Sequence, residues 1–130
     1  MRSQLVKKDG NTVILDAYNA NPSSMKVAIE NMAALKGGRK VLILGDMFEL
    51  EEEAESEHRG IGKLLSQYKF DKVMLCGKLM KVAKEEYSAA SLFETKDALI
   101  EELKKNPVRD SMILVKASRG IGLETVVEFL

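Results

Sequence analysis

Apolar residues follow two patterns along this chain: short continuous runs, and longer segments in which they recur every three or four positions. A continuous run bounded by turn residues is typical of a strand buried on both faces, whereas the helical period predicts a helix with one face on the core. The continuous runs predict strands at 41–44, 73–76, 91–93 and 112–115. The helical period predicts helices at 22–36, 53–68, 79–86, 95–105 and 123–130.

Residues with restricted backbone preferences mark the ends of these elements. Asp9-Gly10 lies between two further β-prone runs, 2–7 and 12–15, and predicts a hairpin because glycine tolerates the positive φ of a tight turn. Asn21-Pro22 predicts a helix start, since asparagine caps well and proline suits the first helical position. Comparable signals for other helix ends are Gly37-Gly38, Thr95 and Asn106-Pro107.

Strands that alternate with helices of roughly ten to fifteen residues favour right-handed crossovers and a parallel sheet. We therefore predict an α/β fold, with a mostly parallel sheet flanked by helices. The N-terminal hairpin should add one antiparallel edge strand. No linker or repeat interrupts the pattern, so residues 1–130 are expected to form a single domain.

Composition narrows the classes of function. The 20 acidic and 20 basic residues balance, which argues against nucleic acid or a membrane surface as a partner. No apolar run approaches the ~20 residues of a membrane span, and residues 1–8 lack the apolar core of a signal peptide. Cys76 has no second cysteine to pair with, so we expect a cytoplasmic protein in which it is a buried strand thiol rather than a nucleophile.

Two kinds of site are missing from the sequence. It has no G-x-x-x-x-G-K-[ST] phosphate loop and no Cys/His cluster with metal-ligand spacing. Gly120 and Gly122 form a G-x-G, but without the rest of the dinucleotide fingerprint this is poor evidence for NAD. We predict no metal ligands here, and no ligation by this chain alone.

Polar residues gather where three predicted strands end, and ligands of parallel sheets bind at that edge. The ends at Gly77 and Glu94 carry no comparable set. The three sets are Asp16, Tyr18, Asn19 and Asn21; Asp46, Met47 and Glu49; and Lys116, Ser118 and Arg119. We predict that they form one site.

Each set also has a purely structural interpretation. Asp16 could bond within its own turn, Asn21 could be only a helix cap, and the acidic run 49–57 could be a solvated first turn. The amides and phenol at the helix start nevertheless suit a phosphate or carboxylate, and Lys116 with Arg119 suits a carboxylate clamp. His58, the only histidine, is a candidate proton carrier or a helix-surface residue.

Three segments resemble motifs of the Mur ligase family, in the family's order. Residues 15–25, LDAYNANPSSM, resemble D-x-Y-N-A-N-P-x-S-M; residues 44–50, LGDMFEL, with His58 following, resemble L-G-D-M-x-E-L…H; and residues 115–119, VKASR, with Glu124 following, resemble V-K-G-S-R…E. Ala117 and Glu51 stand where the family commonly has glycine. The chain is similar to the Rossmann-like C-terminal domain of the members that add a dipeptide.

The resemblance implies the rest of the enzyme. A Mur ligase has an N-terminal domain for the UDP-sugar and a central domain with the phosphate loop, Mg²⁺ and a carbamylated lysine, and this chain resembles neither. ATP would phosphorylate UDP-N-acetylmuramoyl-tripeptide to an acyl phosphate, which the amine of D-alanyl-D-alanine would attack. The product serves peptidoglycan synthesis.

The resemblance also assigns roles. Asp16 would hold the ATP ribose and Arg2 would reach the terminal phosphate, while Tyr18, Asn19 and Asn21 would line the nucleotide and acceptor side. Six residues would receive the dipeptide: Asp46, Met47, Glu49, Lys116, Ser118 and Arg119. His58 would act as a base or only brace the Asp46 loop. Two alternatives stay open: a stand-alone Rossmann-like module that binds a small ligand, and a Mur ligase that adds a single amino acid.

Overall fold

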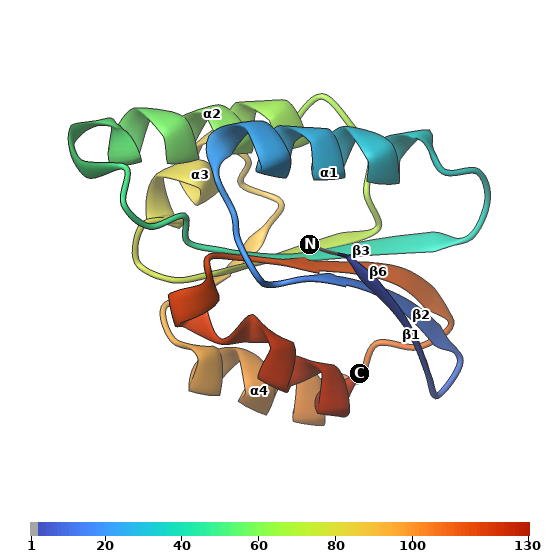
Figure 1. Ribbon diagram of the computed structural model, residues 1–130. Coiled ribbons are helices and arrows are strands. Elements are labelled where there is room, and N and C mark those ends of the chain that lie inside the picture. Colours follow the sequence, from blue (N-terminus) through green and yellow to red (C-terminus); the bar gives the residue numbers. More distant parts are fainter. Residues whose placement is uncertain (1–2) are drawn as a thin grey trace.

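A computed structural model describes residues 3–130, and Arg2 lies outside this range. Its centre is a six-stranded sheet in the order β1-β2-β6-β3-β4-β5, in which only the β1–β2 pair is antiparallel (Figure 1). The strands are β1 (Gln4–Lys8), β2 (Asn11–Asp16), β3 (Arg39–Gly45), β4 (Lys72–Cys76), β5 (Ser91–Phe93) and β6 (Ser111–Lys116). The α/β class, the mostly parallel sheet and the antiparallel edge strand are confirmed.

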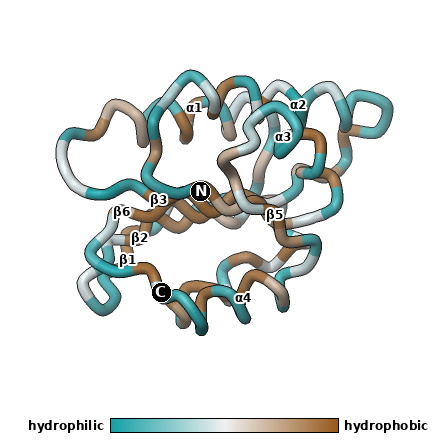
Figure 2. The backbone as a smooth tube through the Cα atoms, turned by 180° about the vertical axis from the view of Figure 1, so that it is seen from behind, coloured by the Kyte–Doolittle hydropathy of each residue, from teal (hydrophilic) through white to brown (hydrophobic). Residues whose placement is uncertain are grey.

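Helices cover both faces of the sheet. In Figure 1, α1 (Pro22–Ala34), α2 (Ala54–Leu65) and α3 (Lys81–Glu86) lie on one face, and α4 (Lys96–Lys105) lies on the other with the C-terminal segment. Alternate residues of β3 serve the two cores: Leu42 and Leu44 pack under α1 and α2, and Val41 and Ile43 face α4. The apolar strands between two helical layers are visible in Figure 2.

The predicted local signals are present. Asp9 and Gly10 have φ values of 50° and 87°, and Lys8 pairs with Asn11 across this two-residue turn. The Asn21 side chain accepts a hydrogen bond from the Ser24 amide at 2.9 Å, and the Ser24 hydroxyl accepts one from the Asn21 amide at 3.1 Å, which completes a capping box. Thr95 caps α4 through the amide of Ala98.

The structure differs in detail from the prediction at three helices. Helix α1 ends at Ala34, before Gly37-Gly38, and α2 is preceded by a separate 3₁₀ turn, η1 (Glu51–Glu53). The final segment is also a 3₁₀ helix, η3 (Leu123–Phe129), which follows the short turn η2 (Arg119–Ile121). Its Thr-Val-Val run is β-branched and therefore a poor α-helix former.

Asn11 joins three segments at the amino end of the sheet. Its side-chain amide donates to the carbonyls of Val108 and Leu130, at 2.9 and 2.8 Å, and its side-chain oxygen accepts from the Ser111 amide at 3.0 Å. Asn11 is almost completely buried, so these bonds replace those it would make to water. One side chain thus ties the hairpin, the start of β6 and the C-terminal residue together.

Over residues 3–130, no helix is both long enough and apolar enough to cross a lipid bilayer.

Candidate functional site

The three polar loops meet at one edge because β2, β6 and β3 are neighbours in the sheet. Parallel pairing aligns their carboxyl ends, with Asp16 opposite Lys116 and Leu44 opposite Lys116 on the other side. In Figure 1 this edge lies at the left, where α1 and α2 begin. The predicted convergence of the loops is confirmed.

Lys116 links the β2 and β6 loops from inside the protein. Its ammonium lies 2.8 Å from a carboxylate oxygen of Asp16 and 3.1 Å from the carbonyl oxygen of Asn19, and the side chain is only 1% exposed. A buried ammonium needs such partners, since desolvation is otherwise costly. Lys116 therefore acts on the geometry of the loops, and its charge is already neutralised by Asp16.

Ser118 and Arg119 link the β6 loop to the other two. The Ser118 amide donates to the Asp46 carbonyl at 3.0 Å, and its hydroxyl accepts from the Phe48 amide at 2.7 Å. The Arg119 guanidinium carbon lies 4.5 Å from the centre of the Tyr18 ring, within the range of a cation–π contact. Tyr18 is 61% exposed, so this pair stands at the surface.

The Asp46 carboxylate is directed into the protein. Its two oxygens accept hydrogen bonds from the amides of Leu79 and Met80, at 3.2 and 3.0 Å. Burial raises the pKa of Asp46, while the hydrogen bonds from these amides act in the opposite direction. The loop after β4, which shows no comparable polar set in the sequence, therefore binds the Asp46 carboxylate through its backbone amides. Gly77, at φ 122°, is needed there, because a Cβ would lie 2.3 Å from the carboxylate.

His58 is fully buried and has protein partners on both ring nitrogens. Nδ1 lies 2.6 Å from the Ala54 carbonyl, which can only accept, so Nδ1 carries the proton. Nε2 then accepts from the Met47 amide at 2.9 Å. This geometry favours the bracing interpretation over a base or a helix-surface residue. Met47 is fully buried as well.

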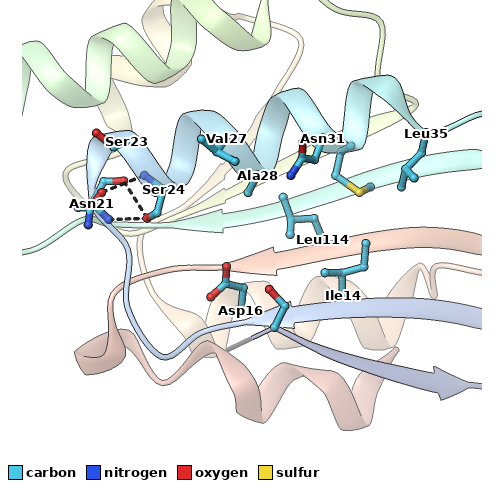
Figure 3. Close-up of a pocket in the computed structure, with 12 residues that line it drawn as sticks. Ile14, Asp16, Asn21, Ser23, Ser24, Val27, Ala28, Asn31, Leu35 and Leu114 are labelled. Carbon is cyan, nitrogen blue, oxygen red and sulfur yellow. Dashed lines mark hydrogen bonds between the residues drawn. The ribbon is translucent and has the colours of Figure 1, made fainter. Parts of the chain in front are cut away.

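Of the hollows near this edge, two border most of the predicted site residues. The first, about 630 Å³, lies between α1 and the sheet (Figure 3), with an apolar floor that includes Ile14 and Leu114 and a polar end that includes Asp16, Asn21 and Ser24. The second, about 490 Å³, lies among the three loops. Its lining is Tyr18, Asn19, Ala20, Phe48, Glu49, Ser118, Arg119 and Gly120.

The predicted site residues fall into three groups: those that border the first hollow, those that border the second, and those that are buried beneath them. Asp16 and Asn21 border the first hollow, while the second combines Tyr18 and Asn19 with Glu49, Ser118 and Arg119. The buried group consists of Asp46, Met47, His58 and Lys116. Arg2 lies outside the described residues. Over the described range, no three His, Cys, Asp or Glu side chains gather as a metal site would require.

Sequence reasoning missed Phe48, Ala20 and Gly120 as lining residues. Phe48 stands between two residues that were named, Met47 and Glu49, and its large aromatic side chain contrasts with the carboxylate that follows it. That contrast was the available signal. Ala20 and Gly120 carry no chemistry, and only the folded chain shows that they border the hollow.

The model of the family described as "Mur ligase, glutamate ligase domain" matches residues 1–119. The chain, an α/β domain with its polar loops at one edge of the sheet, belongs to the Mur ligase family.

The relatives it resembles are more specific. It is 41% identical, over its whole length, to the UDP-N-acetylmuramoyl-tripeptide–D-alanyl-D-alanine ligase of Bacillus subtilis, and 37% identical over 88% of its length to that of Escherichia coli. It covers 30% and 26% of those proteins.

Solved structures agree. A crystal structure of MurF from Acinetobacter baumannii superimposes with a TM-score of 0.84 at 28% identity, covering 96% of this chain and 28% of that one. MurF from Thermotoga maritima in complex with ADP gives 0.75 at 26% identity, covering 96% and 29%. The chain thus spans less than a third of the length of these relatives.

Proposed function

We propose that residues 1–130 form the C-terminal, substrate-closing domain of an ATP-dependent ligase that adds D-alanyl-D-alanine to UDP-N-acetylmuramoyl-tripeptide. The observation that carries the proposal is that contacts of Lys116, Ser118 and Arg119 hold the three loops together around the two hollows. Relatives named for this reaction match the chain along its length. The UDP-sugar and phosphate-loop domains would come from elsewhere in the enzyme.

The first hollow is suited to the nucleotide. One oxygen of Asp16 is held by Lys116, which fixes the carboxylate so that its other oxygen can accept a ribose hydroxyl. Asn21 uses its side-chain oxygen as the cap of α1, and its amide nitrogen has no partner among the described residues. Asn21 stands at the N-terminus of α1, which favours negatively charged ligands. Arg2 remains a predicted contact to the terminal phosphate.

The second hollow is suited to the dipeptide. Arg119 is at the surface with its guanidinium over Tyr18, which leaves the edge of its planar fork to bind a carboxylate in a bidentate way. Glu49 supplies a negative charge in the same hollow. Asp46, Met47, Lys116 and His58 support these groups from beneath, in place of the direct contacts that the sequence suggested.

The division of labour follows from the chemistry. ATP would convert the tripeptide carboxylate to an acyl phosphate, the dipeptide amine would attack its carbonyl carbon, and the tetrahedral intermediate would expel phosphate. This domain would hold the dipeptide by its carboxylate so that the amine points at the reacting carbon. Such positioning can remove roughly 7–11 kcal/mol of the barrier. Closure over the site would also exclude water, which hydrolyses acyl phosphates.

Mg²⁺ is expected in the full enzyme by family resemblance. The described residues offer no cluster of ligands for it, so the proposal assigns no metal ligand to this chain.

The test is Arg119→Ala in the intact ligase. Loss of a charge-assisted pair removes about 1.5–3 kcal/mol, so the KM for D-alanyl-D-alanine should rise on the order of 10- to 150-fold while the KM for ATP stays unchanged. Arg119→Lys, which keeps the charge but not the fork, should fall between.

A change in the KM for ATP instead would assign this loop to the nucleotide. If the unmodified enzyme uses D-glutamate or diaminopimelate rather than the dipeptide, the proposal is wrong about the substrate. If it ligates none of the three, the stand-alone binding module becomes the better explanation.

A further inference from the structure

Phe48 is an exposed aromatic side chain inside the second hollow. It is 40% exposed, although it lies between the fully buried Met47 and the acidic Glu49. An aromatic ring left in contact with water at the wall of a hollow is suited to an apolar group of a ligand.

Backbone hydrogen bonds, a packing contact and the conformation of the next residue together restrain the position of the Phe48 ring. The Phe48 amide donates to the Ser118 hydroxyl at 2.7 Å, and the preceding amide donates to His58. The ring packs on Gly120, where a Cβ would lie 3.0 Å from Cε2 of Phe48. Glu49 follows with φ at 65°, a conformation that costs a non-glycine residue energy and that the surrounding contacts impose.

The Phe48 ring shares its hollow with the cation of Arg119. Gly120, on which it packs, follows Arg119 directly in the chain, and Phe48 and Arg119 both line the hollow. A residue whose carboxylate binds Arg119 would have its side chain near the Phe48 ring. Glu49, next to Phe48, places a negative charge in the same space, so the hollow matches a short peptide with a free carboxylate, a free amine and small apolar side chains.

We infer that Phe48 is a specificity-determining residue: its ring forms the wall against which the C-terminal methyl group of the dipeptide packs, and it limits the size of that side chain. This inference deepens the proposed function and rests on it. It concerns selection between dipeptides and leaves the nucleotide side unaffected, because Phe48 does not border the hollow that contains Asp16.

The experiment compares D-alanyl-D-alanine with D-alanyl-D-leucine as acceptors for the intact ligase. In Phe48→Ala the ratio of their kcat/KM values should fall about tenfold or more, because one methylene in an apolar pocket already discriminates by roughly 10- to 200-fold. Phe48→Leu, which keeps an apolar wall, should shift the ratio less, and the KM for ATP should stay constant in both.

Leu5→Ala is the matched control. Leu5 is 72% exposed on the edge strand β1 and lines neither hollow, so its removal should leave the ratio unchanged. An unchanged ratio in folded Phe48→Ala and Phe48→Leu, with normal ligation of D-alanyl-D-alanine, would overturn this inference alone. Failure of the unmodified enzyme to ligate the dipeptide would overturn the proposed function and the inference with it.

Discussion

Glu51 adopts a left-handed backbone conformation, with φ at 53°, at the start of the 3₁₀ turn that leads into α2. This explains why the family commonly has glycine at this position, since only glycine takes such a φ without strain. Ala117, the other departure from the family pattern, has no positive φ and is buried against Gly45, where a Cβ would lie 2.7 Å from that of Ala117. Of the two residues that replace glycine, Glu51 is therefore strained, whereas Ala117 is accommodated without strain.

Replacing Glu51 by glycine should relieve this strain. Comparison with Glu51→Ala removes the effect of the charge, and the glycine variant should be the more stable of the two by about 1 kcal/mol. The same pair of changes at Glu52, which has no positive φ, should show the opposite order, by about 0.5–1 kcal/mol. Urea unfolding of the four variants measures the difference, and equal stabilities at position 51 would mean that the turn is unstrained.

At the scale of elements, α2 and α3 approach so closely that their backbones touch. A Cβ on Gly62 would lie 2.3 Å from the carbonyl oxygen of Ala83. Above this contact Arg59 donates to three carboxylates, those of Glu55 on its own helix and of Glu85 and Glu86 on α3, which together raise its pKa. Glycine makes the close approach possible, and the ion pairs add modestly to it at the surface.

Gly60 and Gly62, on the same helix, give a matched test of this contact. Gly62→Ala should destabilise the domain by about 1–3 kcal/mol, because a backbone atom cannot move aside as a side chain can. Gly60 has open space around its Cβ position, so Gly60→Ala should stabilise the helix by about 0.5–1 kcal/mol. The free energies of unfolding from denaturant titration decide the matter. Stabilisation by both substitutions would show that α2 and α3 are not in close contact.

At the scale of the whole molecule, the sequence predicts what depends on neighbours in the chain. The hairpin at Asp9-Gly10, the caps of α1 and α4 and the buried strands follow local rules, and so does the burial of Cys76, which raises the pKa of its thiol to about 11. What it did not predict depends on partners that are distant in sequence. Lys116 is buried because Asp16 lies opposite it across the β2–β6 pair, and Asp46 turns inward because the amides after β4 meet it.

One prediction concerns the chain as a unit. Both hollows reach the same edge of the sheet, and the sequence contains no phosphate loop, so the 130-residue chain should fold without catalysing the reaction. Incubation of the chain with ATP, UDP-N-acetylmuramoyl-tripeptide and D-alanyl-D-alanine should release no phosphate above background, whereas the intact enzyme does. Ligation by the chain alone would refute this assignment of roles.

The three hydrogen bonds of the Asn11 side chain have a consequence for how such a domain can change over generations. Asn11 and Asp16 are five positions apart along β2, a span of about 16 Å, so substitutions at the two ends should act nearly additively. At the amino end of the sheet, the Asn11 side chain can maintain thermal stability through its bonds to three backbone segments. Acceptor specificity can then change at the carboxyl end without loss of these bonds. The length of the sheet thus allows the ligand-binding end to change while the stabilising bonds at the other end are kept.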